Sequence, residues 1–454
     1  MTKNHKNIGL YLYLLCVSVY LLLKSSSLLA IDGYLRFALT ESLVERCSVS
    51  SYGTGLPAQS VLQIPLYLIG RAVEDFGCFQ GRNNAREFFV GLLNTFITSL
   101  SVVLFFIVSL KLGFQKKSAL VLALLFAFAS TAFLYARFNS NEPTVCLFLL
   151  GLYFAILNLK EKSSWGNALF LAIMLFCLIC SHYGMIPVAL AAGVLVILKR
   201  KALGLKESQL FAIIALSVVA LFLCAAYNDA RYGSFWLTGY ENQRFSTPTF
   251  TGLYGLLFSP GKSLFLYDPL VLLSLFWFGK FFRREGNTWS AFFVIAIPLY
   301  RLALYAHWHA GFGSMAWSSR RFLPVLPFVL IPLGVMLDRF NKLGKCKRVV
   351  IIAIITFSVL VQLLSIAVHY KHYWLTMGFD EWMPYARHFF SFTDGPLVGQ
   401  FRILIEAFSH PEYFDFFWIS QFPAHPFAVS GAIIALFSIM VVSIFSLKKS
   451  FHRT

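Results

Sequence analysis

The stretch from Lys345 to His369 reads KCKRVVIIAIITFSVLVQLLSIAVH and contains the two features that decide the fold. Three basic residues open it, and the 21 residues from 349 to 369 contain no Asp, Glu, Lys or Arg. An apolar run of this length can cross the hydrocarbon core of a bilayer as an α-helix. Basic residues beside such a run are typical of its cytoplasmic end. The stretch therefore predicts a transmembrane helix that begins at the cytoplasmic face.

The same combination recurs along the whole chain, which has 454 residues, of which 58% are hydrophobic and only 13% are charged. Soluble domains carry about 25% charged residues, so this composition excludes a soluble enzyme. We predict an all-α integral membrane protein, a single polytopic domain over 1–454 with about 12 transmembrane helices. The predicted spans are 8–30, 88–110, 118–136, 143–159, 166–181, 184–198, 209–227, 264–282, 289–306, 322–337, 349–369 and 427–446.

The net charge of +18 would suit a nucleic-acid-binding protein if the basic residues lined one groove. With the N-terminus placed in the cytoplasm, the segments predicted inside carry 22 of the 38 Lys and Arg residues and only four acids. All other segments together carry 16 basic and 16 acidic residues. The excess charge is therefore an orientation signal. It excludes nucleic acid as a partner and predicts a bacterial-type cell membrane protein with both termini in the cytoplasm.

Three segments predicted on the outer side, 31–87, 228–263 and 370–426, are much longer than the inner ones. The first is expected to hold interfacial helices, because its apolar stretches are too short to span a bilayer. The last is a large extracytoplasmic loop, so the working surface is predicted to be extracytoplasmic. A cleaved signal peptide is the alternative interpretation of residues 1–30. We favour an uncleaved first span, in which Lys24 extends its amino group to the outer interface.

The first candidate for chemistry is Asp32, which stands immediately after the first predicted span with Tyr34 and Arg36 close behind. A carboxylate where membrane meets water loses part of its hydration, which favours acceptance of a proton from a hydroxyl group. The alternative is a solvated or helix-capping Asp. The residues that follow predict a helix along the interface, because one helical face would carry Leu35, Ala38, Leu39, Ser42 and Leu43.

Glu142 is the second candidate acid, in the outer turn that reads RFNSNEP from Arg137 to Pro143. Pro is well tolerated in the first turn of a helix, so a helix is expected to begin here. An acid at this position either caps the positive end of the helix or contributes to an active site.

Two outer segments concentrate cations. The first reads GLLFSPGKSLF from Gly255 to Phe265, and its backbone N–H groups and Lys262 could hold an anion. The second ends in Arg320 and Arg321, and Arg suits bidentate contacts to phosphate. Topology does not explain a pair of arginines on the outer side. Arg301 lies within a predicted span, where it needs a partner.

Two pairs of residues leave alternatives open. His307 and His309 are candidates for a divalent metal site or for substrate contacts, but a third ligand is lacking nearby and an interfacial role competes. Cys47 and Cys78 both fall in the first outer loop, where an oxidising compartment would allow a disulfide. Two unpaired thiols are the equal alternative.

The order of these motifs resembles the C-type membrane glycosyltransferases, and in particular the bacterial group of protein mannosyltransferases and lipid A aminoarabinose transferases. The resemblance covers residues 1 to about 340. It rests on Asp32 after the first span, NEP at 141–143, LLFSPGK at 256–262 and SRRFLP at 319–324. The last two motifs are the most specific.

The resemblance implies an enzyme that uses a sugar carried on a polyprenyl phosphate. Asp32 maps onto the general base and Glu142 onto the second acid. Lys262, Arg320 and Arg321 map onto the group that binds the lipid phosphate, with Tyr34, Arg36, His307 and His309 as candidate donor or acceptor contacts. The chain departs from many members because Gly33 replaces a second acid, and the spacer before Arg320 leaves the choice between the two arginines open.

The sequence thus predicts an inverting glycosyltransferase, a hexosyl- or pentosyltransferase that acts on the extracytoplasmic face. Its partners would be membrane lipids, the polyprenyl-phosphate sugar and an acceptor that is a lipid, glycan or protein. A lipid-linked glycan polymerase or ligase is the first alternative, in which outer arginines act without an essential Asp32. A transporter is the second, and it requires broken helices at matching positions of two halves.

Overall fold

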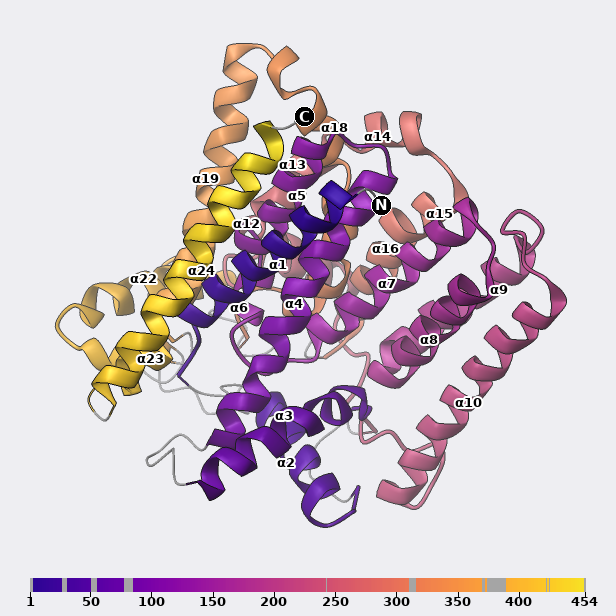
Figure 1. Cartoon of the computed structure of the whole chain (residues 1–454), viewed down its shortest axis with the longest axis horizontal. Helices are drawn as coiled ribbons and strands as arrows, with labels where there is room; N and C mark the ends of the chain where they lie inside the picture. The colour runs from indigo at the N-terminus through magenta and orange to yellow at the C-terminus, as the bar shows by residue number, and fades with distance from the viewer. Residues whose placement is uncertain are drawn as a thin grey trace. The chain divides into compact units, whose positions relative to one another are not determined.

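The computed structural model describes residues 3–26, 31–49, 55–76, 85–241, 243–309, 316–369, 372–373, 389–421, 423 and 425–452. These residues form helices joined by turns, and no strand occurs among them, only an isolated bridge between Val368 and Phe414. The predicted all-α architecture is confirmed (Figure 1).

Six helical stretches in the described part of the chain are long and apolar enough to cross a membrane. They are α4 (Ala85–Lys111), α7 (Glu142–Glu161), α10 (Glu207–Tyr232), the continuous stretch Thr288–His307, α19 (Lys345–Ala367) and α24 (Pro426–His452). Shorter apolar helices are α1 (Lys3–Leu22), α8 (Trp165–Ser181) and α9 (Ile186–Leu198). The stretch Thr288–His307 is made of α15 (Thr288–Ala291), a π-helical turn Phe292–Ala296 and α16 (Ile297–His307).

Three predicted spans are divided into shorter helices. The span 118–136 contains α5 (Lys116–Phe128) and α6 (Ala132–Tyr135). The span 264–282 contains α12 (Leu264–Tyr267), α13 (Pro269–Leu275) and α14 (Phe278–Glu285). The span 322–337 contains η3 (Arg320–Val325), α17 (Leu326–Leu330) and α18 (Leu333–Asp338). Proline explains the breaks at Pro269, Pro327 and Pro332, because it lacks the backbone N–H that would continue the preceding helix.

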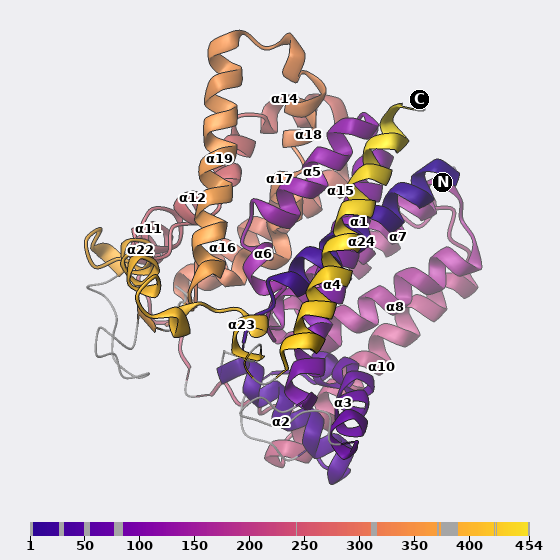
Figure 2. The same cartoon turned by 60° about the vertical axis from the view of Figure 1, so that its left-hand side comes forward.

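The chain forms two compact units. Unit 1 comprises residues 1–26, 98–138 and 244–454, and unit 2 comprises residues 27–97 and 139–243. In unit 1, α1 packs along α24, which both views show (Figures 1 and 2), and α13 packs on α19. In unit 2, α2 (Ile31–Glu45) packs on α3 (Ala58–Asp75), and α8 lies between α7 and α10. Helices α2 and α3 fall where interfacial helices were predicted.

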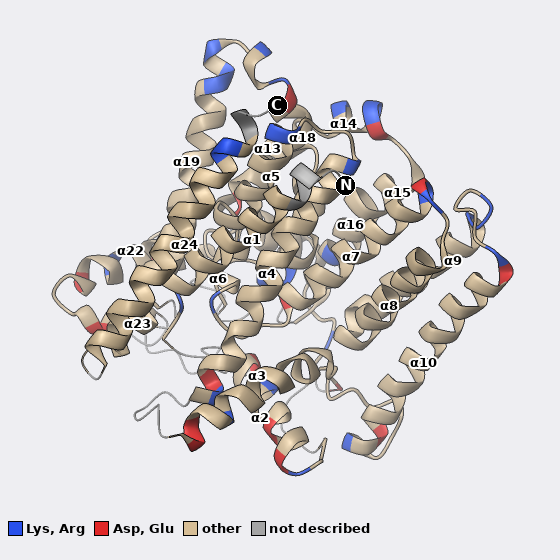
Figure 3. Cartoon of the chain, viewed as in Figure 1, with Lys and Arg blue, Asp and Glu red and all other residues tan. Residues whose placement is uncertain are grey.

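Segments predicted to lie inside the cell meet at one end of unit 1. Arg284 forms an ion pair with Asp338 at 2.9 Å, and the carboxylate of Asp338 also accepts a hydrogen bond from the backbone N–H of Gln115 at 3.0 Å. Lys116 donates to the carbonyl oxygen of Ser450 near the C-terminus at 2.9 Å. Figure 3 marks Lys and Arg positions in blue on the ribbon at the ends of α14 and α19 in this unit. Four of the segments predicted inside thus lie together in unit 1, while their orientation in the membrane stays a prediction.

Candidate active site

Lys262 lies in unit 1 between α11 (Thr249–Leu257) and α12, and its side chain is fully buried. The turn that carries it is closed by the Ser259 hydroxyl, which donates to the Gly255 carbonyl at 2.6 Å and accepts from the Lys262 N–H at 3.2 Å. Helix α11 lies very close to α16, because a side chain at Gly252 would overlap the carbonyl oxygen of Ala306. The local sequence thus fixes Lys262 against the neighbouring helix.

The loop from Ala316 to Arg321 is held residue by residue against the rest of unit 1. The carbonyl of Ala316 accepts a hydrogen bond from Lys262 Nζ, and Ser319 Oγ donates to the carbonyl of Lys262 at 2.6 Å. The Trp317 carbonyl accepts from Tyr135 Oη at 2.8 Å. These contacts preorganise the segment in which the two arginines begin η3.

Ser318 is the strained position of this loop, with φ of 58° although it is not glycine. Its hydroxyl lies 3.5 Å from that of Thr131, and Thr131 donates from its backbone N–H to Asp268 at 2.7 Å. The side chain of Thr131 also bonds to the Asp268 carboxylate. The buried Asp268 carboxylate therefore supports the loop through Thr131.

Arg301 and Arg321 share one aromatic partner. The guanidinium carbon of each lies 4.8 Å from the centre of the Tyr305 ring. Arg301 Nε also donates to the carbonyl of Arg321 at 3.0 Å, so the buried arginine of the predicted span has the partner it requires. Its Nη1 atom is buried with no hydrogen-bond partner in the described part of the protein. Arg320 and Arg321 themselves are partly exposed.

The electrostatics of this cluster are strongly positive. Burial holds the pKa of Lys262 well below its ordinary value, and the positive charges of Arg320 and Arg321 lower it further. Burial and Arg321 also lower the pKa of His309. An anion placed among these groups would favour their charged forms, because a nearby opposite charge raises the pKa of Lys and His and so opposes both effects. The cluster is therefore suited to hold a phosphate.

His307 and His309 are exposed at the end of α16 and just beyond it. His307 Nε2 lies 3.2 Å from the hydroxyl of Thr249, and the His309 N–H donates to the Arg244 carbonyl at 3.0 Å. Within the described ranges, no group of three or more His, Cys, Asp or Glu residues is arranged to hold a metal ion.

Asp32 lies in unit 2, exposed in the first turn of α2. The carbonyl of the next residue, Gly33, accepts a hydrogen bond from Asn139 Nδ2 at 2.9 Å. Asn139 Oδ1 accepts in turn from Gln59 Nε2 at 2.6 Å and from Gln63 Nε2 at 2.7 Å. A buried amide network between α2, α3 and the 139–142 segment thus fixes the backbone that presents Asp32.

Glu142 is the first residue of α7, where its charge complements the positive end of the helix. It is half-buried and accepts a hydrogen bond from the Ser140 hydroxyl. Asn141 Nδ2 donates to the Ser181 carbonyl at 2.9 Å and Asn94 Nδ2 to the Ser140 carbonyl at 2.7 Å. The NEP turn is therefore rigid, and it carries Glu142 on the same short segment whose Asn139 contacts Gly33.

The remaining predicted site residues also lie in unit 2. Tyr34 is exposed, and Arg36 is half-buried beside Gly55. Cys47 is exposed in the described part of the loop, whereas Cys78 lies outside the described residues. The Cys47–Cys78 disulfide therefore stays a prediction.

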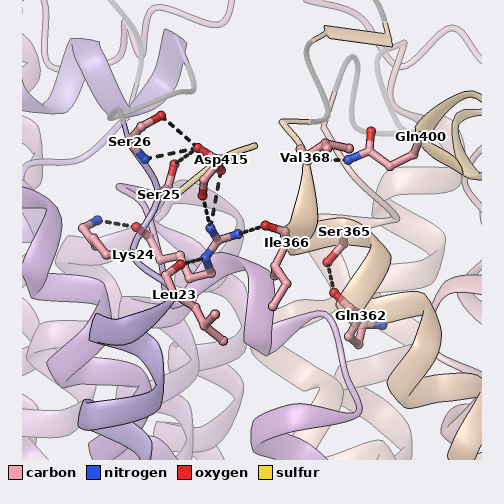
Figure 4. Close-up of polar contacts among 11 residues, drawn as sticks. Leu23, Lys24, Ser25, Ser26, Gln362, Ser365, Ile366, Val368, Gln400 and Asp415 are labelled. Atoms are coloured by element: carbon pink, nitrogen blue, oxygen red, sulfur yellow. Dashed lines mark hydrogen bonds and ion pairs between the residues drawn. The ribbon is translucent and has the colours of Figure 1, made fainter. Parts of the chain in front are cut away.

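A buried ionic cluster in unit 1 was not found from the sequence (Figure 4). The Arg137 guanidinium lies 3.6 Å from an Asp415 carboxylate oxygen, donates to the Ile366 carbonyl at 3.0 Å and bonds to the carbonyl of Leu23. The other Asp415 oxygen accepts from the hydroxyls of two serines after α1, Ser25 at 2.9 Å and Ser26 at 3.0 Å. The cluster ties the ends of three helices to the segment before α23 (Phe417–Gln421).

Lys24 belongs to the same cluster, and its predicted position is wrong. We expected its amino group to reach the outer interface, but the residue is only 3% exposed and its Nζ donates to the Arg137 carbonyl. Helix α1 ends at Leu22, earlier than the predicted span, so Lys24 turns into the protein beside Arg137.

The predicted site residues thus form two groups. Lys262, Arg320, Arg321 and His309 come together with Arg301 in unit 1. Asp32, Glu142, Tyr34 and Arg36 lie in unit 2, where Asn139 links the Asp32 and Glu142 segments.

Comparison with known proteins supports this fold. No family model and no curated protein matches the sequence. Among solved structures, ArnT from Cupriavidus metallidurans in the apo state is similar over 97% of this chain and 75% of its own, with 14% identity and a TM-score of 0.51. The same ArnT bound to undecaprenyl phosphate is similar over 97% and 76%, with 14% identity and a TM-score of 0.50.

A third similar structure is the archaeal oligosaccharyltransferase AglB from Archaeoglobus fulgidus, in complex with an inhibitory peptide and a dolichol-phosphate. It matches 86% of this chain and 59% of its own length, with 12% identity and a TM-score of 0.50. ArnT and AglB are both polytopic glycosyltransferases of the C type. The chain therefore has the fold of these membrane enzymes, as its motifs predicted.

Proposed function

We propose that this protein is a glycosyltransferase that moves a sugar from a polyprenyl-phosphate carrier to an acceptor at the extracytoplasmic face of the cell membrane. The observation that carries the proposal is the preorganised cluster of buried Lys262 with the partly exposed Arg320 and Arg321 in a C-type fold. The fold is shared with an ArnT structure that contains undecaprenyl phosphate, which supports the same class of carrier here.

The cation cluster would hold the phosphate of the carrier and stabilise the charge that develops on it as the sugar leaves. Hydrogen-bond donors that are fixed before the reaction stabilise the charge that develops in the transition state, and the protein need not reorganise to provide them. The Arg guanidinium fork suits the phosphate oxygens, and a bound phosphate would also favour the protonated form of Lys262.

Asp32 would act as the general base. The acceptor oxygen or nitrogen attacks the anomeric carbon from the face opposite the phosphate, the bond from that carbon to the phosphate oxygen breaks, and polyprenyl phosphate leaves. Asp32 takes the proton of the acceptor, and the anomeric configuration is inverted. The Asn139–Gly33 hydrogen bond supports this role, because it fixes the backbone beside an exposed carboxylate.

Glu142 would act as a second acid near Asp32, on the segment that Asn139 anchors. His307 and His309 would contact the donor, since His309 lies within electrostatic range of Arg321. The predicted orientation places both termini in the cytoplasm and these residues outside, which fits the use of a lipid carrier at the outer leaflet.

The transporter alternative requires matching helix breaks in two halves of the chain. Divided spans occur at 118–136 in the first half of the sequence and at 264–282 and 322–337 in the second. A measurement of donor movement beside sugar transfer separates the two functions.

The test is transfer of label from a radioactive polyprenyl-phosphate sugar to extracted envelope lipids and glycans, with the purified full chain in vesicles. We expect labelled acceptor to appear with release of polyprenyl phosphate in equal amount. Movement of intact donor across the vesicle membrane without transfer would contradict the proposal and favour a transporter. Formation of long chains of labelled sugar would favour a polymerase.

A further inference from the structure

A second pair of arginines meets in unit 2, away from the residues assigned to the carrier phosphate. Arg36 projects from α2 and Arg231 from the last turn of α10, and both reach Gly55. Arg36 Nη2 would lie 3.3 Å from a Cβ placed on Gly55, while Arg231 Nη1 lies 3.5 Å from the Gly55 carbonyl oxygen. The two guanidiniums therefore border the same glycine.

Gly55 is required at this position. Its φ of +107° belongs to a backbone region that other residues rarely adopt, and a side chain would press on the Arg36 guanidinium. The absence of a side chain therefore allows both guanidiniums to approach the same backbone turn.

Three tyrosines lie beside Arg231 and Gly55. Arg231 Nη1 donates to Tyr227 Oη at 3.0 Å, and its guanidinium carbon lies 5.2 Å and 4.9 Å from the ring centres of Tyr227 and Tyr232. Tyr240 Oη would lie 3.9 Å from the same Gly55 Cβ. Guanidiniums stacked on aromatic rings keep a fixed orientation and can direct their remaining N–H groups to a ligand.

Glu241, which lies within electrostatic range of Tyr232, already accepts hydrogen bonds from the backbone N–H groups of Thr238 and Gly239. The acids on α2 and α3 are paired with other arginines. Glu45 pairs with Arg71 at 3.0 Å, and Arg86 pairs with Glu41 at 3.2 Å and with Glu74 at 2.7 Å. Arg36 forms no ion pair with any residue that the structure describes, and its Nε is buried without a hydrogen-bond partner there. A buried donor of this kind is costly unless a ligand completes it.

We propose that Arg36, Arg231, Tyr227 and Tyr240 form a second anion site, framed by Gly55, that binds a phosphate group. Two guanidinium forks and two hydroxyls offer more donors than a single carboxylate can accept, whereas a phosphate presents at least three oxygens to them. Its phosphate belongs to a substrate, either the carrier or a phosphorylated acceptor, and that part of the inference rests on the proposed function. Binding of phosphate itself does not.

The test is chemical modification of arginine by phenylglyoxal in the detergent-solubilised full chain, with the rate at each Arg measured by peptide mass spectrometry. Inorganic phosphate is expected to slow modification of Arg36 and Arg231 by about tenfold or more, the loss expected when a charge-assisted hydrogen bond occupies the group. Sodium chloride at equal ionic strength serves as the control. Arg71, which is exposed and paired with Glu45, is the internal control and should be unaffected.

Two variants make the result specific. Arg36→Gln should abolish the protection of Arg231 while leaving that of Arg321 unchanged, and Arg71→Gln should leave both unchanged. Equal rates at Arg36 and Arg231 with and without phosphate would overturn the proposal, as would equal slowing at Arg71. Each variant is first checked for an unchanged unfolding temperature.

Two further protection measurements distinguish the two possible sources of the phosphate, the carrier and the acceptor. Protection of Arg36 by a short-chain polyprenyl phosphate alone would assign the site to the carrier. Protection only when inorganic phosphate is added to saturating polyprenyl phosphate would assign it to the acceptor. Neither measurement depends on sugar transfer. A failure to detect transfer in other experiments would therefore leave the evidence for phosphate binding unchanged.

Discussion

Lys262 Nζ donates a hydrogen bond to the carbonyl oxygen of Ala316, and this contact joins the turn after α11 to the loop that carries the two outer arginines. Ser319 closes the connection from the other side, with its hydroxyl on the Lys262 carbonyl at 2.6 Å. The two cationic segments, which are more than fifty residues apart in sequence, therefore form one rigid unit. Rigid placement is what a site needs to stabilise a developing charge.

Ser319→Ala should weaken binding of a polyprenyl phosphate without changing the charge of the site. The substitution leaves the buried carbonyl of Lys262 without this partner, a cost of about 1–3 kcal/mol, and loosens the arginine loop. The measurement is the Kd of a short-chain polyprenyl phosphate in detergent. Ser438→Ala is the matched control, because Ser438 makes an equivalent bond to a helix carbonyl, Ile434 at 2.8 Å, on exposed α24. Equal effects of the two substitutions would count against a preorganised loop.

Arg321→Ala should strongly reduce donor affinity. Arg321 is fixed by stacking on Tyr305 and by the bond from Arg301 to its carbonyl. A fixed guanidinium loses little freedom on binding phosphate, so its removal is costly. Titration of Arg321→Ala and of the wild type with the same phosphate lipid tests this, and an unchanged affinity would contradict the assignment of Arg321 to the phosphate.

The sequence predicted the helical segments well, because long apolar runs with basic flanks carry a strong signal at 88–110 and 349–369. It did not predict the division of 264–282 and 322–337, where Pro269, Pro327 and Pro332 lie inside apolar runs. Motifs singled out Lys262, Arg320 and Arg321 as candidates, but the contacts of Arg321 with Tyr305 and Arg301 join two separate segments and required tertiary structure. The cluster of Arg137, Lys24 and Asp415 was not predicted, because its contacts join segments up to 390 residues apart. The RFNSNEP turn already contained Arg137, and a cation on the outer side was the available signal.

Asp415→Ala should strongly destabilise the protein. Arg137 is fully buried, and removing its partner leaves an uncompensated charge, which costs about 3–5 kcal/mol. The double variant Arg137→Met with Asp415→Leu should recover part of that loss, since it removes both charges. Thermal unfolding of the two variants in the same detergent measures the difference. A double variant less stable than Asp415→Ala would show that the pair itself supplies the stability.

Raising the pH should stabilise the folded protein through Lys262. Its pKa is well below the ordinary value in the folded state, so between the folded and unfolded pKa values the unfolded chain binds the extra proton. The stability that depends on this group is therefore complete above the pKa of Lys262 in the unfolded chain. It is lost as the pH falls to the pKa of Lys262 in the folded protein. We expect the unfolding temperature of the wild type relative to Lys262→Met to rise from pH 7 to pH 10. A parallel pH dependence of the two proteins would show that Lys262 titrates normally.

The most direct test of the proposed activity is sugar transfer and donor binding measured together for Asp32→Asn. The substitution keeps the size of the side chain but removes proton acceptance, so transfer from a radiolabelled polyprenyl-phosphate sugar in vesicles should fall by about 100-fold or more. Donor binding should stay near the wild-type value, because the cations assigned to the phosphate are untouched. Near-normal transfer by folded Asp32→Asn protein would contradict the assignment of Asp32 as the base and favour a polymerase or ligase that acts through its arginines.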